Sequence, residues 1–170
     1  AARVRHLTTQ AKVDTRRFVH DETGWNYRLT NVAAAIGLAQ LEQLAGFIAV
    51  KRRSHELYRE LLAGVPGVTL VGSQPGTAPN HWFHSVLVDA EQFGCDREAL
   101  MNALAERGIE SRPVWGLLHE QRPFAGCTAW RIERAPRFWA RVLNLPCSSD
   151  LDEADVARVA TAILAIGRAA

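Results

Sequence analysis

The chain has 170 residues, of which 48% are hydrophobic and 22% are charged, a composition ordinary for one soluble globular domain with a real core. The net charge is +2 and the basic residues are dispersed, so no nucleic-acid partner is expected, because such partners usually meet a clustered basic face. No apolar run is expected to span a bilayer, no signal peptide is recognised, and no membrane partner is expected. The three separated cysteines favour a reduced, cytoplasmic setting and no metal site.

Residues 1–30 show no clear periodicity and are predicted to form an arm that packs on something else. A solvated, partly disordered tail is the alternative. Because the chain lacks an initiator methionine and starts like the middle of a longer sequence, we expect a fragment or a clipped chain.

A long helix is predicted over residues 31–64. Thr30 is a suitable N-cap, because its hydroxyl can accept a free amide of the first turn. Alanine and glycine make the first part of the helix thin, which would let another backbone approach closely. The pattern is longer than a usual globular helix, so we expect a bend or break near Ala45–Gly46. It is predicted to stop at Gly64, before Pro66.

Residues 65–170 are predicted to form an α+β domain, with one mostly antiparallel sheet and helices on one side. Asp96 is expected to cap a helix that Gly108 ends. Strands are expected in 67–72, 82–90, 109–114 and 142–146, helices in 96–108 and 150–167 with a shorter one after residue 131, and irregular structure in 115–130.

The Asn26-Tyr27-Arg28 segment lies directly before the long helix. An amide and a guanidinium beside a helix N-terminus suit an anion, because the helix end offers free N–H groups and partial positive charge. The alternative is structural, with Asn26 in a turn and Arg28 paired with Asp21 or Glu22. The residue types alone favour this alternative.

A second candidate site is the loop after the strand near residue 110. It contains Arg112, Trp115, His119 and Arg122, and aromatic and basic groups together suit a nucleotide or a sugar phosphate. The alternative is a surface loop anchored by a buried tryptophan.

His81 and His84 are expected to face one side of their strand, where two histidines could bind a metal ion. No third ligand is evident, so a packed or rim position is favoured for both.

Several blocks of this sequence resemble the nucleotide-sugar aminotransferases of the DegT type, which are fold-type I pyridoxal-phosphate enzymes. The blocks are "HDETGWNYRLTNVAAAIGLAQLEQL", "HWFHSVLV", "LAERGIESRPVWGLLHEQRPF" and "VLNLPCSSDLDEADVARV", in the family's order. The resemblance implies the C-terminal small domain of such an enzyme, with residues 1–30 as an arm of the cofactor site, 31–64 as a connecting helix and 65–170 as the α+β domain. Two departures are mild: Ala33 stands where relatives commonly have Gln, and Trp25 replaces a more usual Tyr.

The same resemblance implies the chemistry and the site residues. Pyridoxal 5'-phosphate would be the cofactor, glutamate the amino donor and a nucleotide-linked 4-keto-6-deoxy sugar the acceptor, in a homodimer with shared active sites. Asn26 would bind the cofactor phosphate of the other subunit, with Arg28 close by. Arg112, Trp115 and His119 would lie on the substrate side.

The resemblance also implies that the Schiff-base lysine lies upstream of these residues. The chain has two lysines, Lys12 and Lys51, and neither matches the family position, so the chain alone is expected to be inactive. Two alternatives stay open. The parent protein could be a cofactor-dependent sugar dehydratase of the same family, or the chain could be a binding or assembly module without catalytic activity.

Overall fold

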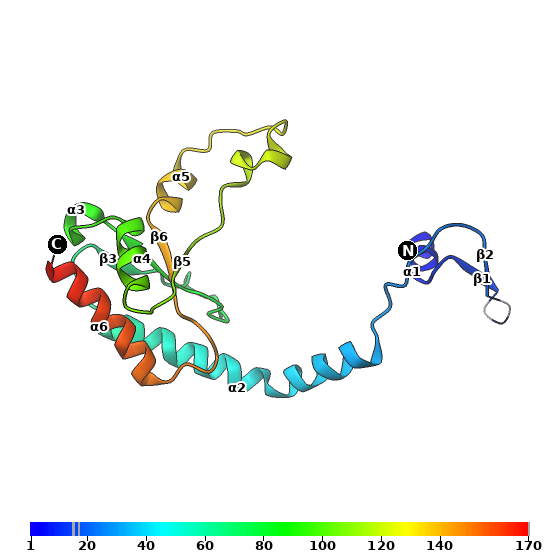
Figure 1. Cartoon of the computed structure of the whole chain (residues 1–170), viewed down its shortest axis with the longest axis horizontal. Helices are drawn as coiled ribbons and strands as arrows, with labels where there is room; N and C mark the ends of the chain where they lie inside the picture. Colours follow the sequence, from blue (N-terminus) through cyan, green and yellow to red (C-terminus); the bar gives the residue numbers. More distant parts are fainter. Residues whose placement is uncertain (15, 17, 170) are drawn as a thin grey trace. The chain divides into compact units, whose positions relative to one another are not determined.

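The computed structural model describes residues 1–14, 16 and 18–169 (Figure 1). The chain divides into two compact units, Ala1–Leu44 and Ala45–Ala170. Helix α2, Asn31–Leu61, belongs to both, since the division falls within it. Each unit is therefore described by itself.

The first unit contains more regular structure than the sequence indicates. Helix α1 spans Ala2–Thr8, and the strands β1, Lys12–Asp14, and β2, Val19–His20, pair antiparallel. The alternative of a partly disordered tail is thus wrong for the part of 1–30 that the structure describes, while the arm that packs on something else stays a prediction. These elements are short, and contacts distant in sequence hold them. One such contact joins His6 Nε2 to Asp21 Oδ1 at 2.6 Å, and another is the ion pair of Arg3 with Glu22.

Helix α2 begins as the sequence predicts. The Thr30 hydroxyl accepts a hydrogen bond from the Ala33 amide at 3.2 Å, which satisfies one of the donors that the first turn leaves open. The helix then continues without interruption to Leu61, so a break near Ala45–Gly46 is excluded, while a bend there stays a prediction. One glycine lowers helix stability by about 1 kcal/mol relative to alanine, and that is too little to interrupt a helix of this length.

The sequence-based expectation that no apolar run could span a bilayer is wrong for helix α2. By length and composition it is long and apolar enough to do so, and the apolar stretch is not buried within the structure. Glu42 is the one charged residue between Asn31 and Val50, because alanine, glycine and larger apolar residues fill most other positions. The finding is weak evidence for a membrane, since core helices of soluble proteins meet the same criterion.

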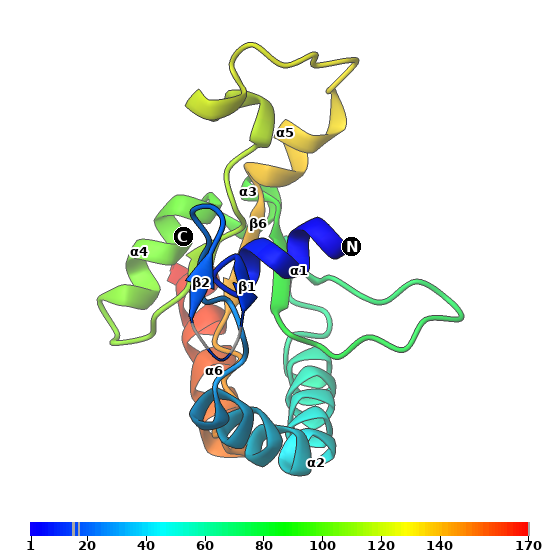
Figure 2. The same cartoon turned by 90° about the vertical axis from the view of Figure 1, so that its right-hand side faces the viewer.

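The second unit is built on an antiparallel sheet of four strands in the order β3-β4-β6-β5 (Figure 1). Its predicted strands and helices are confirmed, and Asp96 caps α4 through the Ala99 amide at 2.8 Å. Two exposed segments leave this sheet: the loop between β3 and β4, and the segment that carries η1, η2 and α5 (Figure 2). The elements are β3 Val68–Leu70, β4 His84–Val88, α3 Ala90–Phe93, α4 Arg97–Ala105, β5 Arg112–Pro113, η1 Leu118–Glu120, η2 Arg122–Phe124, α5 Arg134–Trp139, β6 Val142–Leu145 and α6 Glu153–Ala169.

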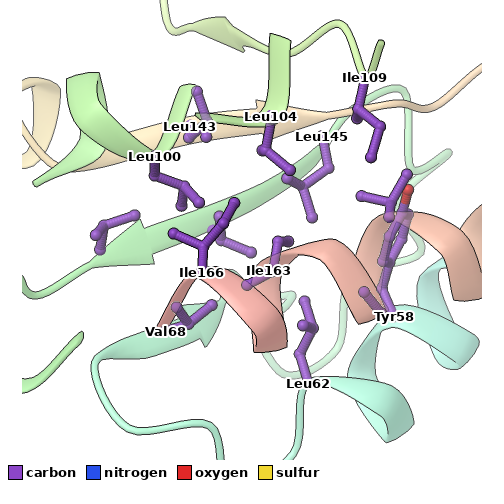
Figure 3. Packing of buried hydrophobic residues seen from close by; sticks show 14 of the residues in the cluster. Tyr58, Leu62, Val68, Leu100, Leu104, Ile109, Leu143, Leu145, Ile163 and Ile166 are labelled. Carbon is purple, nitrogen blue, oxygen red and sulfur yellow. The ribbon is translucent and has the colours of Figure 1, made fainter. Parts of the chain in front are cut away.

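The core lies on one face of this sheet. The register pairs Val86 with Leu143 and His84 with Leu145, which places these side chains on the same face. Leucines of α4 and isoleucines of α6 point into the same cluster (Figure 3). Helix α2 adds Tyr58, whose hydroxyl donates to the Pro146 carbonyl at 3.1 Å. The predicted α+β architecture, with helices covering one face and a long helix first, is confirmed.

We expect Leu143→Ala to lower the free energy of unfolding of the second unit by about 2–5 kcal/mol, because the change leaves a cavity at the centre of the core. Leu143 is fully buried, whereas Leu118 is 69% exposed. The matched control Leu118→Ala should therefore stay within about 0.5 kcal/mol of the parent chain. Urea denaturation followed by circular dichroism measures both variants, and equal losses would contradict the assignment of the core.

Candidate functional site

The Asn26-Tyr27-Arg28 segment is held in place by the C-terminal end of α1. The Trp25 amide donates to the Leu7 carbonyl at 2.8 Å, and the Tyr27 amide donates to the Thr8 carbonyl at 3.0 Å. Asn26 forms an isolated antiparallel bridge with Thr9. The backbone of this segment is thus fixed before α2 begins.

Gly24 makes this close approach of two backbones possible. A Cβ atom at position 24 would lie 2.5 Å from the Ala11 nitrogen, 2.6 Å from the Gln10 carbonyl carbon and 2.9 Å from the Leu7 oxygen. All three are backbone atoms, which cannot move aside as a flexible side chain could. Only glycine fits at this position without displacing the segment that carries Asn26.

The side chains of Asn26 and Arg28 contact each other. Arg28 Nε donates to Asn26 Oδ1 at 3.1 Å. The sequence-based alternative, in which Arg28 pairs with Asp21 or Glu22, is wrong, because those carboxylates contact His6 and Arg3. The contact uses the Asn26 oxygen as an acceptor, so the Asn26 amide NH2 and the remaining guanidinium nitrogens are the donors that this pair can offer.

The donor set beside the start of α2 has the chemistry of an anion site. It combines an amide NH2, a guanidinium and the N-terminus of a helix of 31 residues. A phosphate group fits such donors, because it has several oxygens that accept charge-assisted hydrogen bonds. The residues present therefore fit the phosphate of a cofactor.

Arg112, Trp115 and His119 lie in the second unit, and the structure does not bring them into one site. Arg112, in β5, pairs with Glu110 at 2.5 Å, and both side chains are exposed. This hydrogen bond raises the pKa of Arg112. His119, in η1, lies 3.6 Å from a Glu120 carboxylate oxygen.

Arg112 lines a cavity of about 500 Å³ between the β5–β6 edge and α6. Ser111, Asn144 and Arg158 add polar groups to its wall, while Phe83 and Leu145 add apolar ones. Trp115 and His119 are not among its lining residues. The cavity is large enough for part of a small-molecule ligand.

Trp115 belongs to an exposed aromatic cluster with Trp82 and Phe83. Its ring centroid lies 5.3 Å from that of Phe83, in an edge-to-face arrangement, and 5.9 Å from that of Trp82. Trp115 is 68% exposed, so the alternative of a buried tryptophan anchor is wrong. The sequence pattern predicts a strand from Trp82, but both Trp82 and Phe83 lie before β4, and no local pattern connects them with Trp115, which is distant in sequence.

Both lysines contact neighbouring groups of the chain. Lys51 Nζ donates to the carbonyl oxygens of Trp82 and Cys147. Lys12 Nζ lies 4.6 Å from the centre of the Phe18 ring, as a cation–π contact.

Comparison with known proteins gives a match over nearly the whole chain. Residues 1–164 match the family described as the DegT/DnrJ/EryC1/StrS aminotransferase family. The chain belongs to this family. GDP-perosamine synthase of Vibrio cholerae is 35% identical over 160 residues, covering 92% of this chain and 42% of that protein. GDP-perosamine synthase of Caulobacter vibrioides is 34% identical over 169 residues, covering 96% and 44%.

Solved structures agree with this assignment. DesI, whose crystal structure was determined in the presence of its TDP-sugar product, has a TM-score of 0.83 and 30% identity, and the match covers 98% of this chain and 42% of that chain. TlmJ of Streptoalloteichus hindustanus has a TM-score of 0.84 and 26% identity, covering 99% and 44%. The chain therefore spans less than half the length of these relatives and corresponds to their C-terminal portion. The predicted family and fold are confirmed.

We expect Gly24→Ala to destabilise the packing of the 24–28 segment on α1 by about 1–3 kcal/mol, because the added methyl group overlaps backbone atoms. Hydrogen exchange at the Trp25 and Tyr27 amides, which donate to α1 carbonyls, should become faster. Gly37→Ala is the matched control, since nothing lies within 4 Å of a Cβ atom there and the residue is inside a helix. Unchanged exchange in the Gly24 variant would contradict the proposed close approach.

Proposed function

We propose that this chain is the C-terminal part of a pyridoxal-phosphate-dependent aminotransferase that aminates a nucleotide-linked 4-keto-6-deoxy sugar with glutamate as the donor. The family match over residues 1–164 is the observation that carries the proposal. The names of relatives support it: two are GDP-perosamine synthases, and EpsN of Bacillus subtilis, 30% identical over 166 residues, is described as a putative pyridoxal phosphate-dependent aminotransferase.

In this proposal, Asn26 and Arg28 hold the phosphate of a cofactor whose reactive part lies in another subunit. The pyridoxal phosphate ring, when bound, would act as the electron sink for amino transfer. The Asn26 amide donates to a phosphate oxygen, and the Arg28 guanidinium balances the negative charge. Because the Arg28 side chain also donates to Asn26 Oδ1, it orients the amide for this role.

The proposed protein is a cytoplasmic homodimer with shared active sites. The N-terminal half of α2 supports a second copy as the partner, because Val32, Ile36 and Leu41 are exposed there among alanines and glycines. Apolar surface of this kind is stabilised when a partner covers it. Small residues also let the partner backbone approach closely.

On the substrate side, the proposal assigns Arg112, Trp115 and His119 to contacts with the nucleotide sugar. Arg112 has a planar guanidinium group that can donate two parallel hydrogen bonds to the anionic part of the substrate. Trp115 offers an exposed ring face for stacking, and His119 is a polar group on the same loop. The two cofactor residues and these three residues belong to different compact units.

The catalytic lysine is assigned to sequence upstream of these residues. Lys51 supports this assignment through its contacts with two backbone carbonyls. Treating the 170-residue chain with pyridoxal phosphate and borohydride should leave both lysines unmodified at stoichiometric cofactor. A cofactor adduct on Lys12 or Lys51 would contradict the assignment.

A sugar dehydratase is the second candidate. A relative named dTDP-4-dehydro-2,6-dideoxy-D-glucose 3-dehydratase, of Saccharopolyspora spinosa, is 32% identical over 111 residues. That match covers 65% of this chain, whereas the matches with the two perosamine synthases cover more than nine-tenths of it. This difference favours the aminotransferase.

The experiment that tests the function uses the full-length protein that contains this chain. Incubated with pyridoxal phosphate, glutamate and a nucleoside-diphosphate 4-keto-6-deoxyhexose, it should form one 2-oxoglutarate per aminated sugar. Mass spectrometry of the product distinguishes the candidates, because amination replaces a carbonyl oxygen by an amine, whereas dehydration removes water. Loss of a hydroxyl group without glutamate consumption would establish the dehydratase instead.

In the same full-length protein, we expect Asn26→Ala to weaken pyridoxal phosphate binding by about ten- to a hundredfold, which is the range for losing a hydrogen bond to a charged group. The exposed amide Asn102, on α4, provides the control variant Asn102→Ala. Fluorescence titration of the cofactor-free protein measures both dissociation constants. Equal affinity of the Asn26 variant and the parent protein would remove Asn26 from the cofactor site.

A further inference from the structure

A row of three polar side chains crosses the sheet of the second unit on one face. The strand order is β3-β4-β6-β5, and the register pairs Asn144 of β6 with Ser85 of β4 on one side and with Arg112 of β5 on the other. Residues paired in this way lie on the same face of an antiparallel sheet, with Cβ atoms about 4.5–5.5 Å apart. Val86 and Leu143 belong to the opposite face, where the core lies. Three side chains that form hydrogen bonds are therefore neighbours across three strands.

Asn144 is the buried member of this row, with an exposed fraction of 7%. Its Oδ1 accepts a hydrogen bond from the Ser85 hydroxyl at 2.6 Å. Because the oxygen and the nitrogen of an amide lie on opposite sides of the amide carbon, this bond directs the Asn144 NH2 group away from β4 and toward β5. Within the part of the chain that the structure describes, no oxygen accepts a hydrogen bond from this NH2 group. A buried amide thus offers donors that are fixed in direction and unused, which is unusual for a buried polar group.

Asn144 and Arg112 both line the cavity of about 500 Å³ between the β5–β6 edge and α6. The Ser111 hydroxyl belongs to the same wall, and its oxygen is buried without a hydrogen-bond partner among the described residues. An amide NH2 group, a guanidinium and a hydroxyl therefore supply donors to one space. The group that such donors bind best is an oxyanion, which is a carboxylate or a phosphate.

Glu110 occupies part of this donor set. Its Oε1 accepts from Arg112 Nε at 3.0 Å and from Arg112 Nη2 at 2.5 Å. The two side chains are 76% and 78% exposed, and exposed ion pairs contribute little to stability. An oxyanion that enters the cavity can therefore replace the Glu110 carboxylate on the guanidinium at low cost.

The charges around the cavity balance before a ligand binds. Arg112 and Arg158 line the cavity with two positive charges. Glu110 and Asp155 line it with two negative charges. Arg158 is held at the wall by its hydrogen bond to the Arg107 carbonyl at 2.7 Å. When Glu110 leaves Arg112, the charge of the guanidinium becomes available to the ligand.

We propose that Asn144 and Arg112 together bind an oxyanion group of a substrate, that Ser85 orients the Asn144 amide for this contact, and that Glu110 competes with the ligand for the guanidinium. The inference rests on the proposed function for the identity of the ligand. Both proposed substrates carry such a group, because the nucleotide sugar has a diphosphate and glutamate has carboxylates. Asn144 is a binding residue in this proposal, and Ser85 is a positioning residue.

Isothermal titration calorimetry of the full-length protein that contains this chain tests the site. One arm uses the nucleoside diphosphates GDP, UDP and dTDP, and the other uses glutamate. Binding requires no turnover, so a failure here is distinguishable from a failure of the proposed aminotransferase, which is measured by product formation. A protein that forms no aminated sugar can still bind these probes through Asn144, and an active enzyme can bind them without it.

Asn144→Asp is nearly isosteric and places a carboxylate oxygen where the NH2 group donates. It should weaken binding of the probe that uses the site by at least about tenfold, because a donor is replaced by a like charge. A loss confined to the nucleotides identifies a diphosphate as the ligand group, and a loss confined to glutamate identifies a carboxylate. Parent-like affinity for both kinds of probe would overturn the proposal.

Glu110→Gln keeps the proposal testable if the Asn144 variant folds poorly, because Glu110 is exposed and its replacement leaves the core intact. Removal of the competing carboxylate should tighten binding of the same probe by about three- to tenfold. Glu106→Gln is the matched control, since Glu106 is exposed at the end of α4 and does not line the cavity. No gain with either probe in the Glu110 variant, or an equal gain in the control, would count against the site.

The role of Ser85 is tested by a pair of variants. Ser85→Ala removes the hydroxyl that donates to Asn144 Oδ1 and should weaken binding by about two- to fivefold. Ser85→Thr keeps a hydroxyl and suits a strand, so it should restore the affinity of the parent protein. A loss that threonine does not restore would contradict the positioning role, because it would reflect packing and not the hydrogen bond.

Discussion

The packing of the Gly24 backbone against the end of α1 is the constraint on which the candidate cofactor site depends. Without a side chain, Gly24 lets Trp25 and Tyr27 donate to carbonyls of Leu7 and Thr8. Those hydrogen bonds fix the backbone on both sides of Asn26. The side chain of Arg28 then needs only to reach back two residues to contact the Asn26 amide. A short helix thus serves as the support for a pair of donors.

Local patterns account for what the sequence predicted correctly. Asp96 accepts from the Ala99 amide as a helix cap, and Gly108 has the positive φ that ends such a helix. Both features depend on residues within a few positions, so the sequence determines them directly. The alternation in 84–88 likewise marks a strand with one buried face.

Contacts between distant residues account for what the sequence missed. Helix α1 and the hairpin of β1 and β2 have too few apolar residues to produce a periodic signal, and they depend on pairs such as His6 with Asp21. The aromatic cluster joins Trp82 to Trp115, and a ring contact joins His55 to His84. These two pairs join segments of the second unit that are distant in sequence, and no local spacing indicates them.

The proposed roles of the candidate residues rest on the geometry of the chain and on the family resemblance, in different proportions. For Asn26 and Arg28, the structure shows a contact between an amide and a guanidinium directly before a long helix, and the proposed role in holding the cofactor phosphate adds the family resemblance to it. For Arg112, Trp115 and His119 the geometry alone supplies less, since Arg112 is engaged by Glu110 and lines a cavity that the other two do not reach. Their common role on the substrate side is a proposal that rests on the family resemblance.

The N-terminal half of α2 exposes apolar side chains, among them Val32, Ile36 and Leu41. Its residues are apolar enough for a membrane by composition, yet the helix begins with a threonine cap and a polar segment held by α1. Alanine and glycine have small side chains, which allow close contact between backbones. The exposure of Val32, Ile36 and Leu41 among these small residues agrees with the protein partner proposed above. If that partner is a second copy, the donors at the start of α2 come close to an interface, which is where a shared site requires them.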